Sequence, residues 1–161
     1  MIVVRGTKKF LDRVGAAVPV HGLSTGALGD WYANALFWRP QVALFVNEKT
    51  RLPVFVPLAP AKSVVERLPA EFEKVARRIG AEGAALDAEL VVMKDAVLAK
   101  TASRSILGTM NDFVHMAESY RWTTDDVDLV DLAVWLADTP CGVSSPGDAV
   151  WPKDAVRTLL R

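Results

Sequence analysis

The pattern of hydrophobic residues changes near the middle of the chain. Between residues 30 and 58, aromatic and β-branched residues dominate three short runs, DWYANALFW, QVALFVN and RLPVFVP, which proline or polar residues separate. These runs predict three strands of an antiparallel β-meander, and MIVVR at residues 1–5 predicts a fourth strand. Because both faces of the strands are apolar, we expect the sheet to be covered on more than one side.

Beyond residue 60 the hydrophobic period lengthens from two residues to about 3.6, which indicates helices. Pro69, followed by acidic residues, predicts the start of a helix that Gly80 ends. Further helices are expected over residues 84–100 and 105–120, after a threonine cap at 123 or 124, and after Trp151 with Pro152 in the first position. The sequence therefore predicts an α+β fold, in which an N-terminal antiparallel β-meander of three or four strands packs against a C-terminal layer of four or five helices.

Length and composition predict a single domain. The chain has 161 residues, of which 51% are hydrophobic and 24% are charged. These values are typical of one globular domain with a substantial core. No repeat, low-complexity tract or linker-like segment divides the sequence. We therefore expect one domain over residues 1–161, with strands mainly in residues 1–60 and helices mainly in residues 61–161.

Several classes of protein are excluded by what the sequence lacks. No apolar run approaches the roughly 20 residues that would span a bilayer, and the N-terminus lacks the pattern of a signal peptide. The single cysteine, Cys141, cannot form an internal disulfide, and together with His21 and His115 it does not suffice for a usual zinc site. No phosphate-binding loop, dinucleotide fingerprint or nucleophile elbow occurs. We therefore expect a soluble cytoplasmic protein with no metal, no cofactor and no membrane contact.

The net charge is zero, with 19 basic and 19 acidic residues, but the charges are unevenly distributed. Residues 1–60 contain seven Lys or Arg and three Asp or Glu, whereas residues 123–161 contain three Lys or Arg and seven Asp or Glu. Because the sequence lacks an extended run of interleaved basic and aromatic residues, we do not expect broad nucleic-acid binding. The asymmetry leaves three arrangements open: the two ends touch within one molecule, between two copies of the chain, or through a protein partner.

The first group of candidate site residues comes from the hairpin predicted over residues 30–47. Symmetry about the turn at residues 39–40 gives three cross-strand pairs: Asp30 with Lys49, Tyr32 with Asn47, and Asn34 with Phe45. Polar side chains would then gather on one face near Arg51, and Lys8 adds a basic point beside the first strand. Such a group could bind a phosphate or a carboxylate. The alternative is a cross-strand ion pair with turn residues that satisfy the backbone.

The second group lies on the helix predicted over residues 105–120. One face carries residues at helical spacing that are polar or small: Arg104, Gly108, Asn111 and His115. Gly108 suggests a close approach by a ligand or by a neighbouring element. Asn111 and Asp112 are poor helix formers, which favours specific partners for their side chains. Arg104 could reach Asp30 and so join the two halves of the chain.

Five tryptophans are many for a chain of this length. Trp31, Trp122 and Trp135 are expected in the core or at its rim. Trp38 lies beside a turn and is a candidate anchor for a protein partner. The acidic group at residues 125–131 lacks the glycine and the terminal glutamate of a calcium loop, so we expect it to complement the dipole of a helix start.

Several segments, taken in order, resemble a family of small uncharacterised bacterial proteins known only as a domain of unknown function. These segments are TKKFLDRVG, LGDWYAN, NEKT, AKTASRSILGTMNDF and LADTPCG. The most specific are LGDWYAN and SRSILGTMNDF, which contain Asp30, Asn34, Arg104, Asn111 and Asp112. The resemblance covers nearly the whole chain. It implies a compact cytoplasmic α+β domain, but it implies no activity and no catalytic residue.

Three functional hypotheses remain. We favour a non-enzymatic binding or accessory module that recognises a macromolecular partner or a small anionic ligand, because the sequence contains no evident activated nucleophile or base. The rival is a hydrolase or transferase of a phosphate-containing substrate. In this hypothesis Asp30 or Asp112 is the base, and Arg104 binds the anion together with Lys8 or Arg51. The third is a self-associating structural protein. The candidate polar site comprises Lys8, Asp30, Tyr32, Asn34, Asn47, Arg51, Arg104, Asn111 and Asp112.

Overall fold

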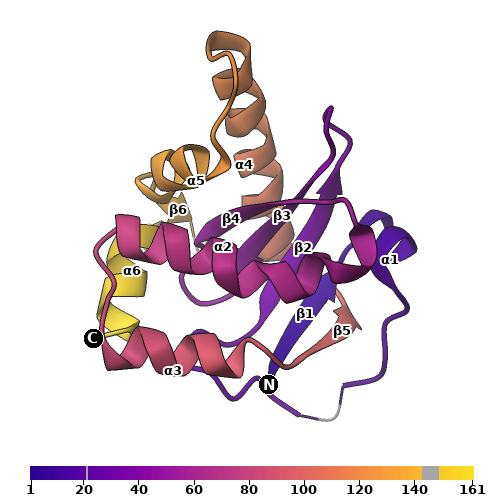
Figure 1. The fold of residues 1–161 in the computed structure, drawn as a ribbon, viewed down its shortest axis with the longest axis vertical. Helices are drawn as coiled ribbons and strands as arrows, with labels where there is room; N and C mark the ends of the chain where they lie inside the picture. Colours follow the sequence, from indigo (N-terminus) through magenta and orange to yellow (C-terminus); the bar gives the residue numbers. More distant parts are fainter. Residues whose placement is uncertain (21, 143–148) are drawn as a thin grey trace.

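The computed structural model describes residues 1–20, 22–142 and 149–161, so His21 lies outside the described residues. Five strands form one mixed sheet in the order β4-β3-β2-β1-β5 (Figure 1). The strands are β1 (Ile2–Gly6), β2 (Trp31–Leu36), β3 (Val42–Asn47), β4 (Pro53–Pro57) and β5 (Ala96–Lys100). Antiparallel pairing of β2 with β3 and of β3 with β4 confirms the predicted meander, and β1 confirms the predicted fourth strand.

The position of β1 corrects the prediction of a purely antiparallel sheet. β1 lies between β2 and β5 and runs parallel to both. Helix α1 (Lys8–Val14), which the hydrophobic pattern does not predict, and the long connection after it return the chain to the start of β2. The predicted helix over residues 84–100 ends at Val92, and residues 96–100 form β5 instead. The run AVLAK is too short to distinguish the two periods, so its pairing with β1 decides its structure.

The helices surround the sheet. After α1 the described chain contains η1 (Ala61–Ser63), α2 (Val64–Arg78), α3 (Ala84–Val92), α4 (Arg104–Thr123), α5 (Leu129–Ala137) and α6 (Pro152–Leu159), with a small ribbon of β6 (Cys141–Gly142) and β7 (Ala149–Val150). Pro69 lies inside α2, so the prediction that it begins this helix is wrong. Asp128 caps α5 in place of the expected threonine, because its carboxylate accepts the Asp131 N–H at 2.8 Å. Pro152 begins α6, as expected.

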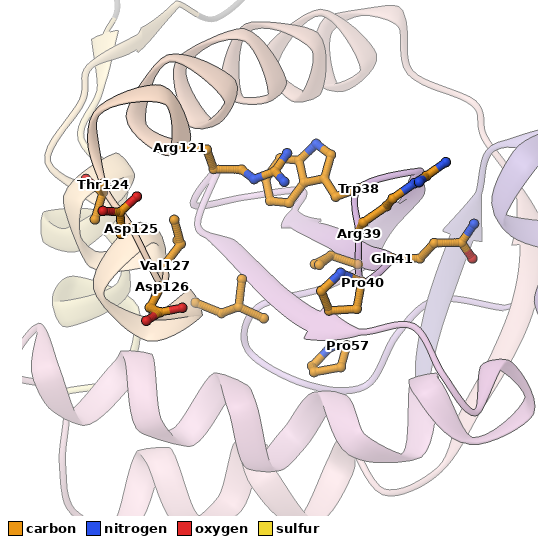
Figure 2. A pocket seen from close by; sticks show the side chains of 12 residues that line it. Trp38, Arg39, Pro40, Gln41, Pro57, Arg121, Thr124, Asp125, Asp126 and Val127 are labelled. Carbon is orange, nitrogen blue, oxygen red and sulfur yellow. The ribbon is translucent and has the colours of Figure 1, made fainter.

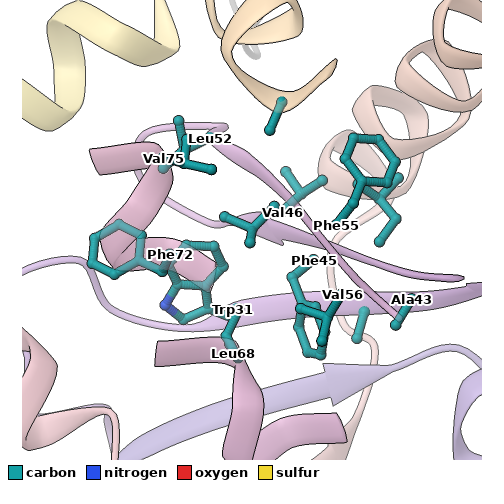
Figure 3. Packing of buried hydrophobic residues seen from close by; sticks show 14 of the residues in the cluster. Trp31, Ala43, Phe45, Val46, Leu52, Phe55, Val56, Leu68, Phe72 and Val75 are labelled. Carbon is teal, nitrogen blue, oxygen red and sulfur yellow. The ribbon is translucent and has the colours of Figure 1, made fainter. Parts of the chain in front are cut away.

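Both faces of the sheet are covered, as its apolar strands predict. On one face α1 packs Phe10 against Phe45, with ring centroids 5.7 Å apart. On the same face α2 packs Phe72 against Trp31, with ring centroids 5.5 Å apart (Figure 3). On the other face α4 packs across β2 and β3 (Figure 1). Helix α5 packs against the edge strand β4 and contacts both α2 and α4. No helix within the described ranges is long and apolar enough to cross a membrane.

The end of α4 projects from the body of the protein (Figure 1). The buried residues of α4 end at Ala117, although the helix continues to Thr123. Trp122 lies in this projecting turn with 89% of its surface exposed, so the expectation that it lies in or beside the core is wrong. Trp135 packs against Tyr120 with ring centroids 5.0 Å apart and is partly exposed, as a residue at the rim of the core would be.

Candidate functional site

The register of the hairpin differs by one residue from the prediction. Trp31, rather than Tyr32, lies opposite Asn47, and Asn34 lies opposite Leu44. The connection is therefore centred on Arg39 and not between residues 39 and 40. Because side chains alternate between the two faces, a shift of one residue moves each partner to the opposite face. The predicted polar face of the hairpin does not form, since Asn47 shares the α2 side with Trp31.

Asn47 is a structural residue. Its side chain is fully buried, and its Nδ2 donates to the carbonyl oxygens of Leu28 at 2.9 Å and Asp30 at 3.3 Å. Its Oδ1 accepts from the backbone N–H groups of Lys49 and Thr50 and from the Thr50 hydroxyl. These contacts use both donors and the acceptor oxygen of the amide, so Asn47 has no capacity left for a ligand.

The two most specific segments of the sequence meet at one cavity of about 340 Å³. LGDWYAN contributes Asp30 and Tyr32 to its lining, and Ser103, the first residue of SRSILGTMNDF, lies opposite them at the start of α4. Glu48 and Lys49, from NEKT, complete the polar part of the lining. We refer to this cavity as the signature pocket.

The charges inside the signature pocket neutralise one another. Arg5 Nε donates to Asp30 Oδ2 at 2.8 Å, and the Ser24 hydroxyl donates to Asp30 Oδ1 at 2.6 Å. The hydrogen bond to Asp30 raises the pKa of Arg5, while burial raises the pKa of Tyr32, so the Tyr32 hydroxyl stays protonated at neutral pH. Asp30 therefore pairs with Arg5, and neither the predicted pairing with Lys49 nor a contact with Arg104 forms.

The remaining candidate residues do not join this pocket. Lys8 forms an exposed ion pair with Asp12 on α1 at 2.9 Å. Asn34 is tied to the chain, because its Oδ1 accepts the Thr7 hydroxyl at 2.7 Å and the Ala35 N–H at 2.9 Å. Two further candidates lie exposed on α4: Arg104 and Asn111.

A second cavity, of about 570 Å³, lies between α4 and β6. Its lining includes Ser105, Asp112 and His115 from α4 and Cys141 from β6. A Cβ at Gly108 would meet nothing within 4 Å among the described residues, so the close approach suggested by this glycine is absent. We refer to this cavity as the α4 cavity. Asp112 and Asp30 thus lie in different cavities.

Arg51 is not among the residues that line the α4 cavity, but its side chain contacts one of them, Ser105, and its state is unusual. Its backbone is left-handed, with φ of 61°, and only 7% of its surface is exposed. Nη2 donates to the Ser105 hydroxyl at 3.1 Å, in the first turn of α4. Nη1 is buried and has no acceptor in the described part of the chain, and none of the ion pairs found there involves Arg51. Burial lowers the pKa of Arg51, but a guanidinium keeps its proton in proteins.

Cys141 is not an activated thiol. Burial raises its pKa to about 11, and the nearby Arg51 cation opposes this shift only partly. The thiolate is the reactive form, so Cys141 is a poor nucleophile at neutral pH. Within the described ranges, no group of three or more His, Cys, Asp and Glu residues is placed to hold a metal ion.

A family model, described as a domain of unknown function (DUF6933), matches residues 3–155. The chain belongs to this family. The match confirms the resemblance noted in the sequence, and the DUF6933 domain spans the sheet, α4 and both cavities. Comparisons with curated proteins and with solved structures give no match.

Two residues that organise the signature pocket of this DUF6933 chain were not among the candidates. Arg5 is the partner of Asp30, and no local pattern indicates this pairing because it depends on β1 lying beside β2. Glu89 is almost fully buried, and its carboxylate accepts the N–H groups of Ala27 at 2.7 Å and Leu28 at 3.3 Å. A carboxylate on the buried side of α3, three residues after Leu86, was the available signal for Glu89.

Proposed function

We propose that this protein is a non-enzymatic binding module that recognises a small anionic ligand, through a carboxylate or phosphate group, in the α4 cavity. The observation that carries this proposal is the state of Arg51. Its guanidinium is buried, it has no carboxylate partner in the described part of the chain, and its Nη1 donors are unused.

An uncompensated buried cation is energetically unfavourable. The penalty for burying an ion is several kcal/mol unless a counter-ion and hydrogen bonds offset it. A guanidinium offers five N–H donors, and Arg51 uses one of them in its hydrogen bond to the Ser105 hydroxyl. A carboxylate or phosphate is the natural partner of the unused side of the fork, because it can accept two parallel N–H bonds. An anion that reached Nη1 from the α4 cavity, past Ser105, would therefore offset a penalty that the ligand-free protein carries.

The start of α4 supports the same ligand. Helix α4 is 20 residues long, and its N-terminal turn, in which the Ser103 hydroxyl accepts the Ile106 N–H, carries the positive end of the helix dipole. Ser105 lies in this turn, lines the cavity and accepts the hydrogen bond from Arg51. The left-handed backbone of Arg51 is a further sign, since strained conformations of this kind cluster at binding sites.

The arrangement supports binding rather than catalysis. A hydrolase or transferase needs a base, an anion-binding cation and a substrate position within one cavity. Asp30 pairs with Arg5 in the signature pocket, and Arg104 is exposed on the surface. Asp112 and His115 do line the α4 cavity, but both are exposed on α4, whereas a catalytic base is typically held in a buried environment that tunes it. Cys141 keeps its proton at neutral pH, because its pKa is raised to about 11.

The proposal is tested by titrating the full chain with inorganic phosphate and, separately, with acetate, at constant ionic strength maintained with chloride. We expect saturable binding by calorimetry for at least one of the two anions. At a ligand concentration 100 times the Kd, the folded state gains about 2.7 kcal/mol, which raises Tm by roughly 5–10 °C.

Two variants decide whether the effect arises at Arg51. Arg51→Met should abolish both the calorimetric signal and the rise in Tm. Arg104→Met removes an exposed cation from the same turn of α4 and should leave both unchanged. The absence of saturable binding to the wild-type chain, or equal binding by Arg51→Met, would refute the proposal.

A further inference from the structure

The projecting end of α4 carries an aromatic side chain that no other part of the described chain covers. Trp122 is 89% exposed, whereas the neighbouring Trp38 is half-buried with both of its faces occupied. Phe55 stacks on one face with ring centroids 5.9 Å apart, and the Arg121 guanidinium lies 4.2 Å from the ring centroid. The free aromatic residue at this end is therefore Trp122 rather than Trp38, the candidate anchor.

A groove of about 440 Å³ lies beside this projecting turn, between the β2–β3 connection and the α4–α5 connection (Figure 2). Its apolar lining consists of Pro40, Val42, Pro57, Val127 and Leu129 together with part of Trp38. An apolar hollow of this size can accept a large aromatic ring, and a buried tryptophan is the commonest kind of energetic anchor in protein interfaces.

The two walls of the groove carry opposite net charges. Arg39 lies on the hairpin side with its side chain directed away from the groove, and Asp125 and Asp126 lie on the side of the α4–α5 connection (Figure 2). Arg121 also lines the groove from α4, so this side carries two acidic residues and one basic residue. None of Arg39, Asp125 and Asp126 belongs to an ion pair found in the described part of the chain. Arg39 therefore has no acidic partner in its own chain among the described residues, and neither have Asp125 and Asp126 a basic one.

We infer that this end of the molecule is a two-fold interface, in which Trp122 of each chain inserts into the groove of a second copy. A two-fold interface must be self-complementary, because the same surface is used by both partners. This surface meets that condition in shape, since an exposed ring lies next to an apolar hollow. It also meets it in charge, since a two-fold axis sets the Arg39 wall of each chain against the Asp125 wall of the other.

The inference is independent of the α4 cavity, and the full chain tests it directly. We expect sedimentation equilibrium between about 1 µM and 1 mM to show a reversible monomer–dimer equilibrium. Trp122→Ala should raise the dimer Kd by about 30-fold or more, because two copies of the anchor are lost. Leu23→Ala truncates a residue that is 84% exposed on another surface and should leave the Kd unchanged. A wild-type chain that is monomeric at 1 mM, or a dimer that Trp122→Ala leaves intact, overturns the inference.

Reversing the charge of Arg39 or of Asp125 distinguishes an ion pair between two chains from an ion pair within one chain. Arg39→Glu and Asp125→Arg should each weaken the dimer by about 5-fold or more when studied alone, because each places like charges opposite one another. An equimolar mixture of the two variants should restore the dimer, because each altered residue then faces an opposite charge on the partner. A mixture that associates no better than the separate variants overturns the inferred pairing. A groove that instead holds a segment of another protein would leave the wild-type chain monomeric, which overturns the inference in the sedimentation experiment.

Discussion

Asn47 and Arg51 are buried polar residues at the two ends of one turn, and they differ in how their hydrogen bonds are satisfied. The Asn47 amide accepts the Thr50 N–H within the turn and donates to the carbonyl oxygens of Leu28 and Asp30, just before β2. Arg51 has one partner, Ser105, and a buried Nη1 without an acceptor in the described residues. Burial alone therefore does not identify a functional residue. What distinguishes Arg51 is hydrogen-bonding capacity that the fold leaves unused.

The origin of the partners explains the difference. Most partners of Asn47 belong to its own turn or to the chain just before β2, so they are fixed once the hairpin forms. The partner of Arg51 lies 54 residues away on α4 and arrives only when this helix packs on the sheet. The turn thus has Asn47 at one end, whose partners are close in sequence, and Arg51 at the other, whose partner is far away in sequence. Three predictions test this contrast.

The largest effect is expected for Asn47→Ala. The substitution leaves buried carbonyl and N–H groups on both sides of the turn without partners, and each such group typically destabilises the fold by about 1–3 kcal/mol. We expect the free energy of unfolding, measured by urea denaturation, to fall by about 3–5 kcal/mol. A loss below about 1 kcal/mol would mean that water or rearranged backbone replaces the amide, and Asn47 would no longer be the structural member of the pair.

Arg51→Met should have a much smaller effect on the ligand-free protein. The substitution loses the hydrogen bond to Ser105, but it also removes a buried cation that has no counter-ion among the described residues. Because these two changes oppose each other, we expect the free energy of unfolding in anion-free buffer to change by no more than about 1 kcal/mol. A loss as large as that of Asn47→Ala would make Arg51 a second structural residue and would remove the main support for an anion site.

The smallest effect concerns Cys141. Its folded-state pKa is raised by burial to about 11 from the usual 9.0, so the folded protein holds this proton longer than the unfolded chain. Stability should therefore fall as pH rises between about 9 and 11, because the unfolded state alone gains from ionisation there. Arg51→Met removes the opposing cation and should raise the pKa of Cys141 further.

Thiolate absorbance near 240 nm, taken as the difference from a Cys141→Ser variant, reports this titration, because the subtraction removes the contribution of the two tyrosines, whose absorbance in this region also rises on ionisation. Arg104→Met is the matched control and should leave the thiol titration unchanged. An identical titration in Arg51→Met and wild type would show that the guanidinium is screened from Cys141, contrary to a cation held in a low-dielectric cavity.

Local pattern predicts the parts of the fold whose partners are near in sequence. The meander of β2, β3 and β4 follows from period-two runs and short connections. The hairpin register is missed by one residue, because it depends on the centre of a turn that the pattern does not locate. The parallel neighbours of β1 and the strand nature of residues 96–100 are set by pairing across most of the chain, and AVLAK alone carries no sign of it.

The candidate site shows the same limit. The residue types were informative, since Asp30 and Tyr32 do line one cavity with Ser103, and Asp112 lines another. Their partners were not predictable, because the cation beside Asp30 comes from β1 and the hydroxyl beside Arg51 comes from α4. An unused donor can be recognised only after every neighbour is known, and so Arg51 could be named from the sequence but not distinguished from Asn47.

The central position of β1 also bears on the order in which the chain folds. Strand β1, the first of the five strands in sequence order, lies between β2 and β5, and β5 is the last of the five. Contacts of such large sequence separation form slowly, whereas the neighbouring strands of the meander can pair early. The α4 cavity lies under the helix that follows β5, so a nascent chain acquires it only at the end of folding. Ligand binding would then act as a signature of completed assembly rather than as an aid to its first steps.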